Sequence, residues 1–214
     1  MQQWKIDYDD AHHHPREKME QLLKHIPSLP YKNVLELFAG KGNLTEFYYY
    51  NCRNNHSLTR LSDIEDMINL KVGMHVIQDT EIEIFNLIAK KKKFNLIDVD
   101  GYGNSGELIK NIFHLTDSKI GSESYILWTF PSNNCGYKKS SVQKLRDLNL
   151  WGAENPKVDD FVKTISHYAS QHYYKTELIS AEKFNLNHNT AYVNRFIVKA
   201  TRVNAKELTK TKDK

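Results

Sequence analysis

Residues 33 to 47, NVLELFAGKGNLTEF, join a short apolar run to a helical pattern through a turn that holds two glycines. The run at 33–38 has the length of a buried strand, and a helix is expected to begin near Asn43. Gly40 and Gly42 permit backbone torsions and a close approach that a side chain would block. A strand, a glycine turn and a helix in this order predict an α/β unit whose free helical N–H groups face a crevice.

Strand and helix patterns continue to alternate along the chain. Strands are expected at 33–38, 57–64, 74–79, 94–100, 124–130, 176–185 and 190–202, and helices at 16–26, 81–93, 106–115 and 158–173. This order predicts an α/β, doubly wound, Rossmann-like domain with a mostly parallel seven-stranded sheet. The last two segments read as an antiparallel pair, so an antiparallel strand is expected near the C-terminus.

Two of the helices have apolar side chains at helical spacing. In the first, Met19, Leu22, Leu23 and Ile26 are expected on one face, and in the last, Val158, Phe161, Val162, Ile165 and Ala169. Either Asn43 or Thr45 is expected to cap the helix after the glycine turn.

The length of 214 residues suggests one domain. We expect an N-terminal helical segment over 1–30 that packs on the domain, the domain itself over 31–202 with a polar insertion at about 132–157, and a basic flexible tail over 203–214. The polar N-terminus does not resemble a signal peptide, and no apolar run approaches the roughly 20 residues that span a bilayer. With two cysteines no disulfide framework is expected, so a reducing, cytoplasmic location is expected.

The net charge of +4 comes from the end of the chain. Residues 199–214 hold six basic and two acidic side chains, and 6 − 2 = +4, so the remaining body is neutral on balance. The charge therefore does not require a polyanionic partner. Lys138, Lys139, Lys144 and Arg146 follow the fifth expected strand and are the candidate contacts to a nucleic-acid backbone.

Acidic residues follow or end several of the expected strands. They are Glu36, Asp63, Asp79, Asp98 and Asp100. The carboxyl ends of parallel strands meet at one edge of such a sheet, which is where ligands bind. The third glycine of a dinucleotide-binding fingerprint is absent, and an acid precedes the turn. This edge therefore favours a cationic or hydroxyl-bearing ligand over a pyrophosphate.

The segment FNLIDVDGYG places two acids at a spacing of two. Asp98 and Asp100 are expected to point to the same side of an extended strand. Like charges raise each other's pKa, so both acids would not lie buried without a partner. We expect backbone donors around Asp98, Asp100 directed into the crevice, and Tyr102 placed to stack on a flat ring.

The stretch VLELFAGKGNLT resembles motif I of the class I S-adenosylmethionine-dependent methyltransferases, and the resemblance extends over about 33–131. It implies a Rossmann-like methyltransferase fold and S-adenosyl-L-methionine as cofactor. Asp63 then corresponds to the acid on the ribose hydroxyls, with Glu65 as an alternative, and Asp79 to the acid on the adenine amino group. The implied cofactor contacts are Glu36, Phe38, Ala39, Gly40, Gly42, Asn43, Asp63, Ile64, Gln78, Asp79 and Asp98.

The stretch IDVDGYGNS resembles motif IV of amino-methyltransferases, most closely the D-x-D-P-[FY]-G-S signature of tRNA N2,N2-dimethylguanosine methyltransferases. Asp98, Asp100, Tyr102, Gly103 and Ser105 match, whereas Gly101 stands where that family has proline. The resemblance implies transfer to an exocyclic amine of a nucleic-acid base, with RNA slightly favoured over DNA. Asp100 and Tyr102 are then the catalytic residues, and Phe130, Lys138 and Lys139 bind the substrate.

Other readings remain open. The chain could be a catalytically silent binding module of the same fold, a methyltransferase of a small molecule or protein, or a nicotinamide-dependent oxidoreductase. Cys135 could be a nucleophile, although no Pro-Cys dipeptide marks it. The DDAHHHP segment at 9–15 could hold a metal, but neighbouring histidines seldom face one ion, so no metal site is expected.

Overall fold

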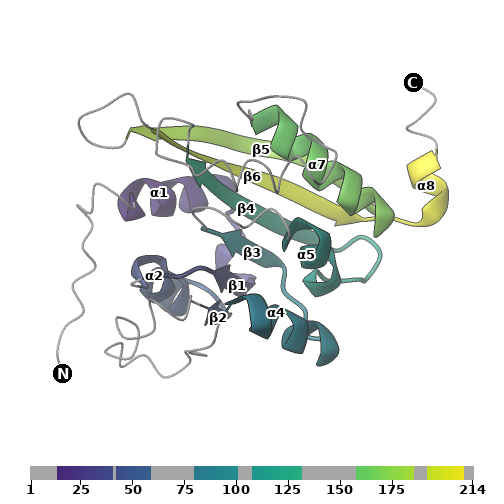
Figure 1. Ribbon diagram of the computed structural model, residues 1–214, viewed down its shortest axis with the longest axis horizontal. Coiled ribbons are helices and arrows are strands. Elements are labelled where there is room, and N and C mark those ends of the chain that lie inside the picture. Colours follow the sequence, from purple (N-terminus) through teal and green to yellow (C-terminus); the bar gives the residue numbers. More distant parts are fainter. Residues whose placement is uncertain are drawn as a thin grey trace.

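The computed structural model describes residues 14–40, 42–58, 80–100, 108–131, 158–185 and 192–209. Its helices are α1 (Pro15–His25), η1 (Leu29–Tyr31), α2 (Asn43–Asn51), α4 (Thr80–Ala89), α5 (Ile109–Leu115), α7 (Val158–Gln171) and α8 (Ala205–Thr209). Its strands are β1 (Asn33–Leu37), β2 (Asn54–Leu58), β3 (Leu96–Val99), β4 (Glu123–Pro131), β5 (Tyr174–Asn185) and β6 (Tyr192–Arg202). Figure 1 shows them as one layered α/β unit.

The described strands form a six-stranded sheet in the order β2-β1-β3-β4-β6-β5. The first four are parallel to one another, and β6 is antiparallel to both β4 and β5. The mostly parallel sheet and the antiparallel strand near the C-terminus are therefore confirmed. The third of the seven expected strands, at 74–79, lies outside the described residues.

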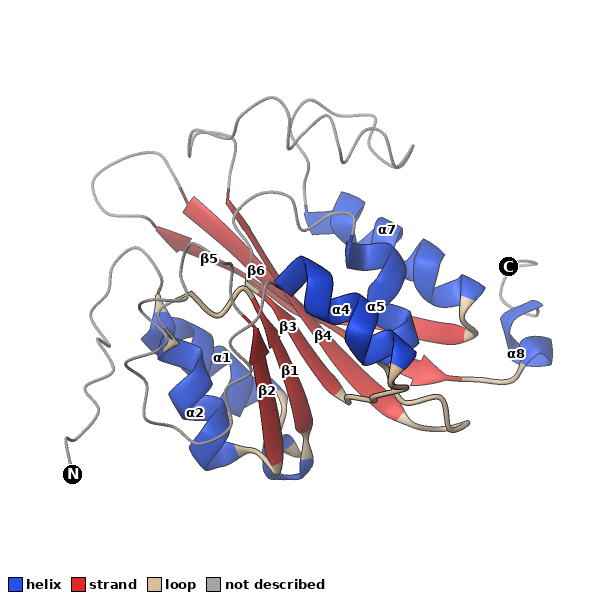
Figure 2. Ribbon diagram, turned by 60° about the horizontal axis from the view of Figure 1, so that its bottom comes forward, coloured by secondary structure: helices blue, strands red, loops and turns tan. Residues whose placement is uncertain are grey.

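Helices cover both faces of the sheet (Figure 2). One face packs against α4, α5 and α7 around Leu35, Ile97 and Trp128. The other packs against α1 and α2 around Val34 and Leu127. Side chains alternate between the two faces along each strand, so both faces are apolar and each needs a covering layer of helices.

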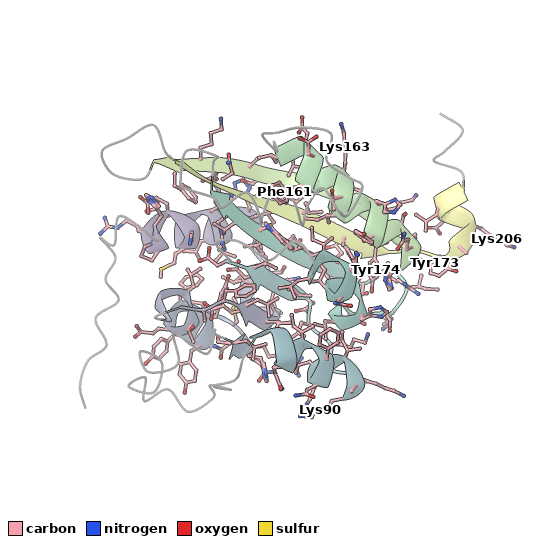
Figure 3. All side chains as sticks on the ribbon, viewed as in Figure 1. Lys90, Phe161, Lys163, Tyr173, Tyr174 and Lys206 are labelled. Atoms are coloured by element: carbon pink, nitrogen blue, oxygen red, sulfur yellow. The ribbon has the colours of Figure 1, made fainter. Side chains whose placement is uncertain are left out.

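Helix α7 follows the apolar spacing of its sequence. Phe161 is buried between Trp128 and Phe196, with ring centroids 6.4 and 5.9 Å away, whereas Lys163 is exposed (Figure 3). Val158 and Val162 are partly buried against the same core, as expected.

Several boundaries and contacts differ from the expectations. The second strand occupies Asn54–Leu58 because its backbone pairs with β1 from Asn33 onward, so it begins before the expected start at 57. On α1, Leu23 is 57% exposed and does not share the buried face. Part of the expected flexible tail, Ala205–Thr209, forms the short helix α8. In the parts of the chain that the structure describes, no helix has the length and apolarity required to cross a membrane.

Candidate active site

On the face of the sheet that α1 and α2 cover, the buried side chains change from apolar to polar toward the carboxyl ends of the parallel strands. Glu36 on β1 and Asp98 on β3 are register partners, and Thr129 on β4 is the partner of Arg195 on β6. All four are at most 1% exposed. The pleat places them on the side of the sheet that α1 and α2 cover, so the sheet builds a buried polar cluster at this edge.

Glu36 lies in a pocket of hydroxyl groups. The hydroxyls of Thr45 and Ser57 both donate to Glu36 Oε2, at 2.6 and 2.5 Å. Burial, reinforced by the nearby charges of Asp98 and Asp100, raises the pKa of Glu36 to about 8, although the two hydroxyl donors oppose the shift. Glu36 therefore holds a proton more readily than an ordinary glutamate does. A cation bound beside it would lower this pKa and favour the ionised form.

The glycine turn after β1 takes the left-handed torsions that its sequence predicts. Gly40 has φ 54° and Gly42 has φ 85°. Gly42 is the N-cap residue of α2, so neither Asn43 nor Thr45 caps this helix, contrary to expectation. The reason is geometric: the helix begins at Asn43, and the Thr45 hydroxyl donates to Glu36.

Asp98 is held by side chains rather than by the expected backbone donors. Tyr48 donates its hydroxyl to Asp98 Oδ2 at 2.5 Å, and Arg195 Nη2 donates to the same oxygen at 2.7 Å. Arg195 Nη1 donates to the Thr129 hydroxyl at 2.7 Å. Burial, and then the charge of Asp98, raises the pKa of Tyr48 well above its ordinary value, so this phenol stays protonated. Asp98 is thereby buried as one member of an ion pair.

Asp100, directly after β3, is held by two cations. Lys18 Nζ of α1 lies 2.6 Å from Asp100 Oδ2, and Arg195 Nη1 lies 3.9 Å from Asp100 Oδ1. Burial would raise the pKa of Asp100, but Lys18 and Arg195 outweigh it and hold this pKa below its ordinary value. Because Arg195 contacts both Asp98 and Asp100, the two acids lie on one side of the strand, and the expected partner exists.

The structure thus brings together Glu36, Asp98 and Asp100 beside the turn that contains Phe38, Ala39, Gly40 and Gly42. Asn43 opens α2 and Phe130 lies on β4, but the side chains of both are outside the described ones. The remaining predicted site residues lie outside the described residues: Asp63, Ile64, Gln78, Asp79, Tyr102, Lys138 and Lys139, as do Cys135 and most of the 9–15 segment.

Sequence reasoning missed the two cations of the site. Lys18 is 1% exposed although it belongs to a run of three charged residues in α1, and Arg195 is fully buried. The sequence position of each could have identified it. Lys18 lies one turn before Leu22 on the same side of the helix, and Arg195 directly precedes the apolar strand segment FIV. A charged residue at a core position calls for a buried partner of opposite sign.

The comparisons with known proteins establish the fold. No protein-family model matches the sequence, and no curated protein matches it either. Among solved structures, M. jannaschii TYW2 in complex with AdoMet has a TM-score of 0.54 and 12% identity, over 95% of this chain and 79% of that one. P. horikoshii TYW2 in complex with MeSAdo has a TM-score of 0.56 and 13% identity, over 92% of this chain and 66% of that one.

A third similar structure is the M. jannaschii tRNA m1G37 methyltransferase, with a TM-score of 0.55 and 11% identity over 87% of this chain. This chain spans only 49% of that protein. The chain therefore has the α/β fold of a methyltransferase, as its first strand and turn indicated. Identities this low show the fold, and the chemistry has to be argued from the site itself.

Proposed function

We propose that the protein is an S-adenosylmethionine-dependent methyltransferase that acts on an exocyclic amine of a nucleic-acid base, with RNA slightly favoured over DNA. The observation that carries the proposal is the clustering of Glu36, Asp98 and Asp100 at the carboxyl edge of the sheet beside a left-handed glycine turn. S-adenosylmethionine carries a sulfonium and an ammonium. Lys18 and Arg195 already neutralise Asp98 and Asp100, so Glu36 is the acid of this edge that is left to face such a cation.

The residues present fit this cofactor. A side chain at Gly40 would be strained by its φ of 54°, so the turn keeps a bare backbone where a ligand can approach. The turn and Glu36 would hold the amino-acid end of the cofactor, and Asp63 and Asp79 would hold its ribose and adenine. When bound, the cofactor supplies an already activated methyl group, so the protein has to position the acceptor and exclude water.

Asp100 would receive the acceptor. A carboxylate with a lowered pKa stays ionised near neutrality and accepts an N–H of the substrate amine, which orients the nitrogen toward the methyl donor. Tyr102 would stack on the base, with Phe130 beside it, and Lys138 and Lys139 would contact the phosphate backbone. The tRNA-directed activity named for the m1G37 methyltransferase supports RNA as the first substrate to test.

The test separates binding from transfer. Wild type and Asp100→Ala are compared for transfer of labelled methyl groups to bulk tRNA, DNA and protein, and for affinity for S-adenosylhomocysteine. We expect Asp100→Ala to abolish transfer while affinity changes by less than about tenfold, because Asp100 contacts the acceptor and not the cofactor. Equal loss of both would contradict the role of Asp100, and binding without any transfer by wild type would favour a silent binding module.

A further inference from the structure

The contact between Lys18 and Asp100 joins the N-terminal helix to the proposed catalytic acid. The two atoms Nζ and Oδ2 lie 2.6 Å apart, and the side chains are 1% and 15% exposed. An ammonium donating to a carboxylate at this distance is a strong charge-assisted hydrogen bond. Helix α1 thus contributes a side chain to the site in addition to covering one face of the sheet.

Helix α1 is fixed in this place by further polar contacts. Gln21, one turn after Lys18, donates to the Ser180 hydroxyl at 3.1 Å and to the backbone oxygen of Arg195 at 3.4 Å. Gln21 is 1% exposed. The helix therefore presents Lys18 and Gln21 to the sheet from a docked position, so Lys18 does not reach Asp100 as a loose surface side chain.

Displacing Lys18 from Asp100 would be costly. A buried charge that loses its partner pays a desolvation penalty that a neutral N–H from a substrate cannot repay. The Lys18 ammonium also has no free lone pair while it donates to Asp100, so it is not itself a methyl acceptor. Both arguments favour a Lys18 that stays on Oδ2 while a substrate binds.

The second oxygen of Asp100 is the one that Lys18 does not occupy. Within the residues that the structure describes, Asp100 Oδ1 is buried, Arg195 Nη1 lies 3.9 Å from it, and the Thr129 hydroxyl is close enough to help hold the pKa of Asp100 low. A carboxylate oxygen can accept more than one hydrogen bond. Because Lys18 occupies Oδ2, Oδ1 is the oxygen with room to accept an N–H from a substrate.

We propose that Lys18 is a positioning residue for the transfer reaction: it holds Asp100 ionised and oriented through Oδ2 and leaves Oδ1 to accept the substrate amine. This inference rests on the proposed function. The charged groups near Asp100 are Lys18 from α1, Glu36 from β1 and Arg195 from β6, and Arg195 in turn pairs with Asp98 of β3, which also accepts from Tyr48 of α2. Of the two cations, only Lys18 forms a hydrogen bond with Asp100.

The test uses three variants of the full chain. Lys18→Met removes the cation, Lys18→Arg restores one, and Lys24→Met alters an exposed lysine of the same helix as the matched control. The Asp100 carboxyl is titrated by carbon-13 NMR of aspartate-labelled protein, with Asp100→Asn providing the assignment. Affinity for S-adenosylhomocysteine and the rate of labelled methyl transfer to bulk tRNA are measured across the same pH range.

We expect Lys18→Met to raise the pKa of Asp100 by about one unit or more, while Lys18→Arg and Lys24→Met stay close to wild type. Transfer by Lys18→Met should fall about tenfold or more at the acidic end of the profile and recover as pH rises. Lys18→Arg should transfer within about threefold of wild type, and every variant should bind S-adenosylhomocysteine within about threefold.

An unchanged Asp100 titration in Lys18→Met overturns the inference, whether or not transfer is observed. A Lys18→Met transfer profile parallel to that of wild type overturns it as well, and leaves the proposed function standing. Absence of S-adenosylhomocysteine binding by wild type contradicts the proposed function instead, and the carboxyl titration still reports whether Lys18 controls Asp100.

Discussion

Arg195 of β6 reaches across β4 to Asp98 of β3, with 2.7 Å between Nη2 and Oδ2 and no exposed surface on either side chain. On the way, its Nη1 donates to Thr129 of the intervening strand. The antiparallel strand β6 is thus tied to the parallel part of the sheet by a charge pair as well as by backbone hydrogen bonds. The same guanidinium lies beside Asp100. Arg195 therefore contributes both to the stability of the sheet and to the charge of the site.

Removal of this cation should strongly destabilise the protein. Arg195→Met leaves Asp98 buried without its charged partner, and we expect a loss of about 3–5 kcal/mol in the free energy of unfolding. Urea denaturation measures the change. Arg53→Met, at an exposed position, is the control and should change the free energy by less than about 0.5 kcal/mol.

The double variant Arg195→Met/Asp98→Asn gives a second check. It removes both charges, so it should be less destabilised than Arg195→Met alone. Asp98→Asn alone completes the comparison. If Arg195→Met is as stable as wild type, or if the double variant loses the sum of the two single losses, the pair is not coupled as its geometry indicates.

Glu36 should make the stability of the protein depend on pH. Its pKa is raised from 4.5 to about 8 in the folded chain, so between these values the folded state holds a proton that the unfolded state has released. Stability from this group is therefore fully present below about pH 4.5 and is lost as pH rises through about 8. Within this window the slope approaches at most about 1.4 kcal/mol per pH unit.

Urea denaturation of wild type and Glu36→Gln over this pH range measures the effect. Glutamine keeps the size and an acceptor oxygen for Thr45 and Ser57 but cannot ionise, so the slope due to this residue should disappear. The two proteins should differ most in their pH dependence between about pH 5 and 8. Parallel stability profiles would mean that Glu36 does not retain its proton on folding.

Substitution of Gly40 should lower both the stability of the protein and its affinity for the cofactor. Its φ of 54° makes an L side chain unfavourable, so Gly40→Ala should cost about 1–2 kcal/mol of stability. The control is Gly121→Ala, at a turn with φ 80° and open space around the added methyl group.

Both alanine variants should lose similar stability, because both strain a left-handed position. Only Gly40→Ala should also weaken S-adenosylhomocysteine, by about tenfold or more, since only Gly40 lies in the proposed cofactor turn. Thermal denaturation and calorimetry read the two effects separately. If both variants bind S-adenosylhomocysteine with equal affinity, Gly40 is not part of the cofactor site.

Local patterns predicted the backbone of the glycine turn and the placement of the two acids at the end of β3. The glycine turn after β1 and the spacing of Asp98 and Asp100 depend on residues close in sequence, where torsional freedom and the period of a strand decide the geometry. The statement that two neighbouring acids need a partner was also correct, because desolvation of like charges holds in any fold.

The identity of the partners depended on tertiary register and could not be read from local patterns. Lys18 lies 82 residues from Asp100 in sequence, and Arg195 lies 97 residues from Asp98. Which residue of α1 faces β3, and which residue of β6 lies beside Thr129, follows from how the elements dock. The prediction of the capping residue of α2 was wrong for a related reason. The Thr45 hydroxyl donates to the buried Glu36, an acceptor that the local sequence does not reveal.

The most direct test of the central claim is titration calorimetry of the purified protein with S-adenosylhomocysteine, with NAD as the comparison ligand. The clustered acids and the glycine turn predict a single saturable site with measurable heat for S-adenosylhomocysteine and none for NAD. Heat with NAD alone, or no heat with S-adenosylhomocysteine and S-adenosylmethionine at protein concentrations where the fold is intact, would contradict it.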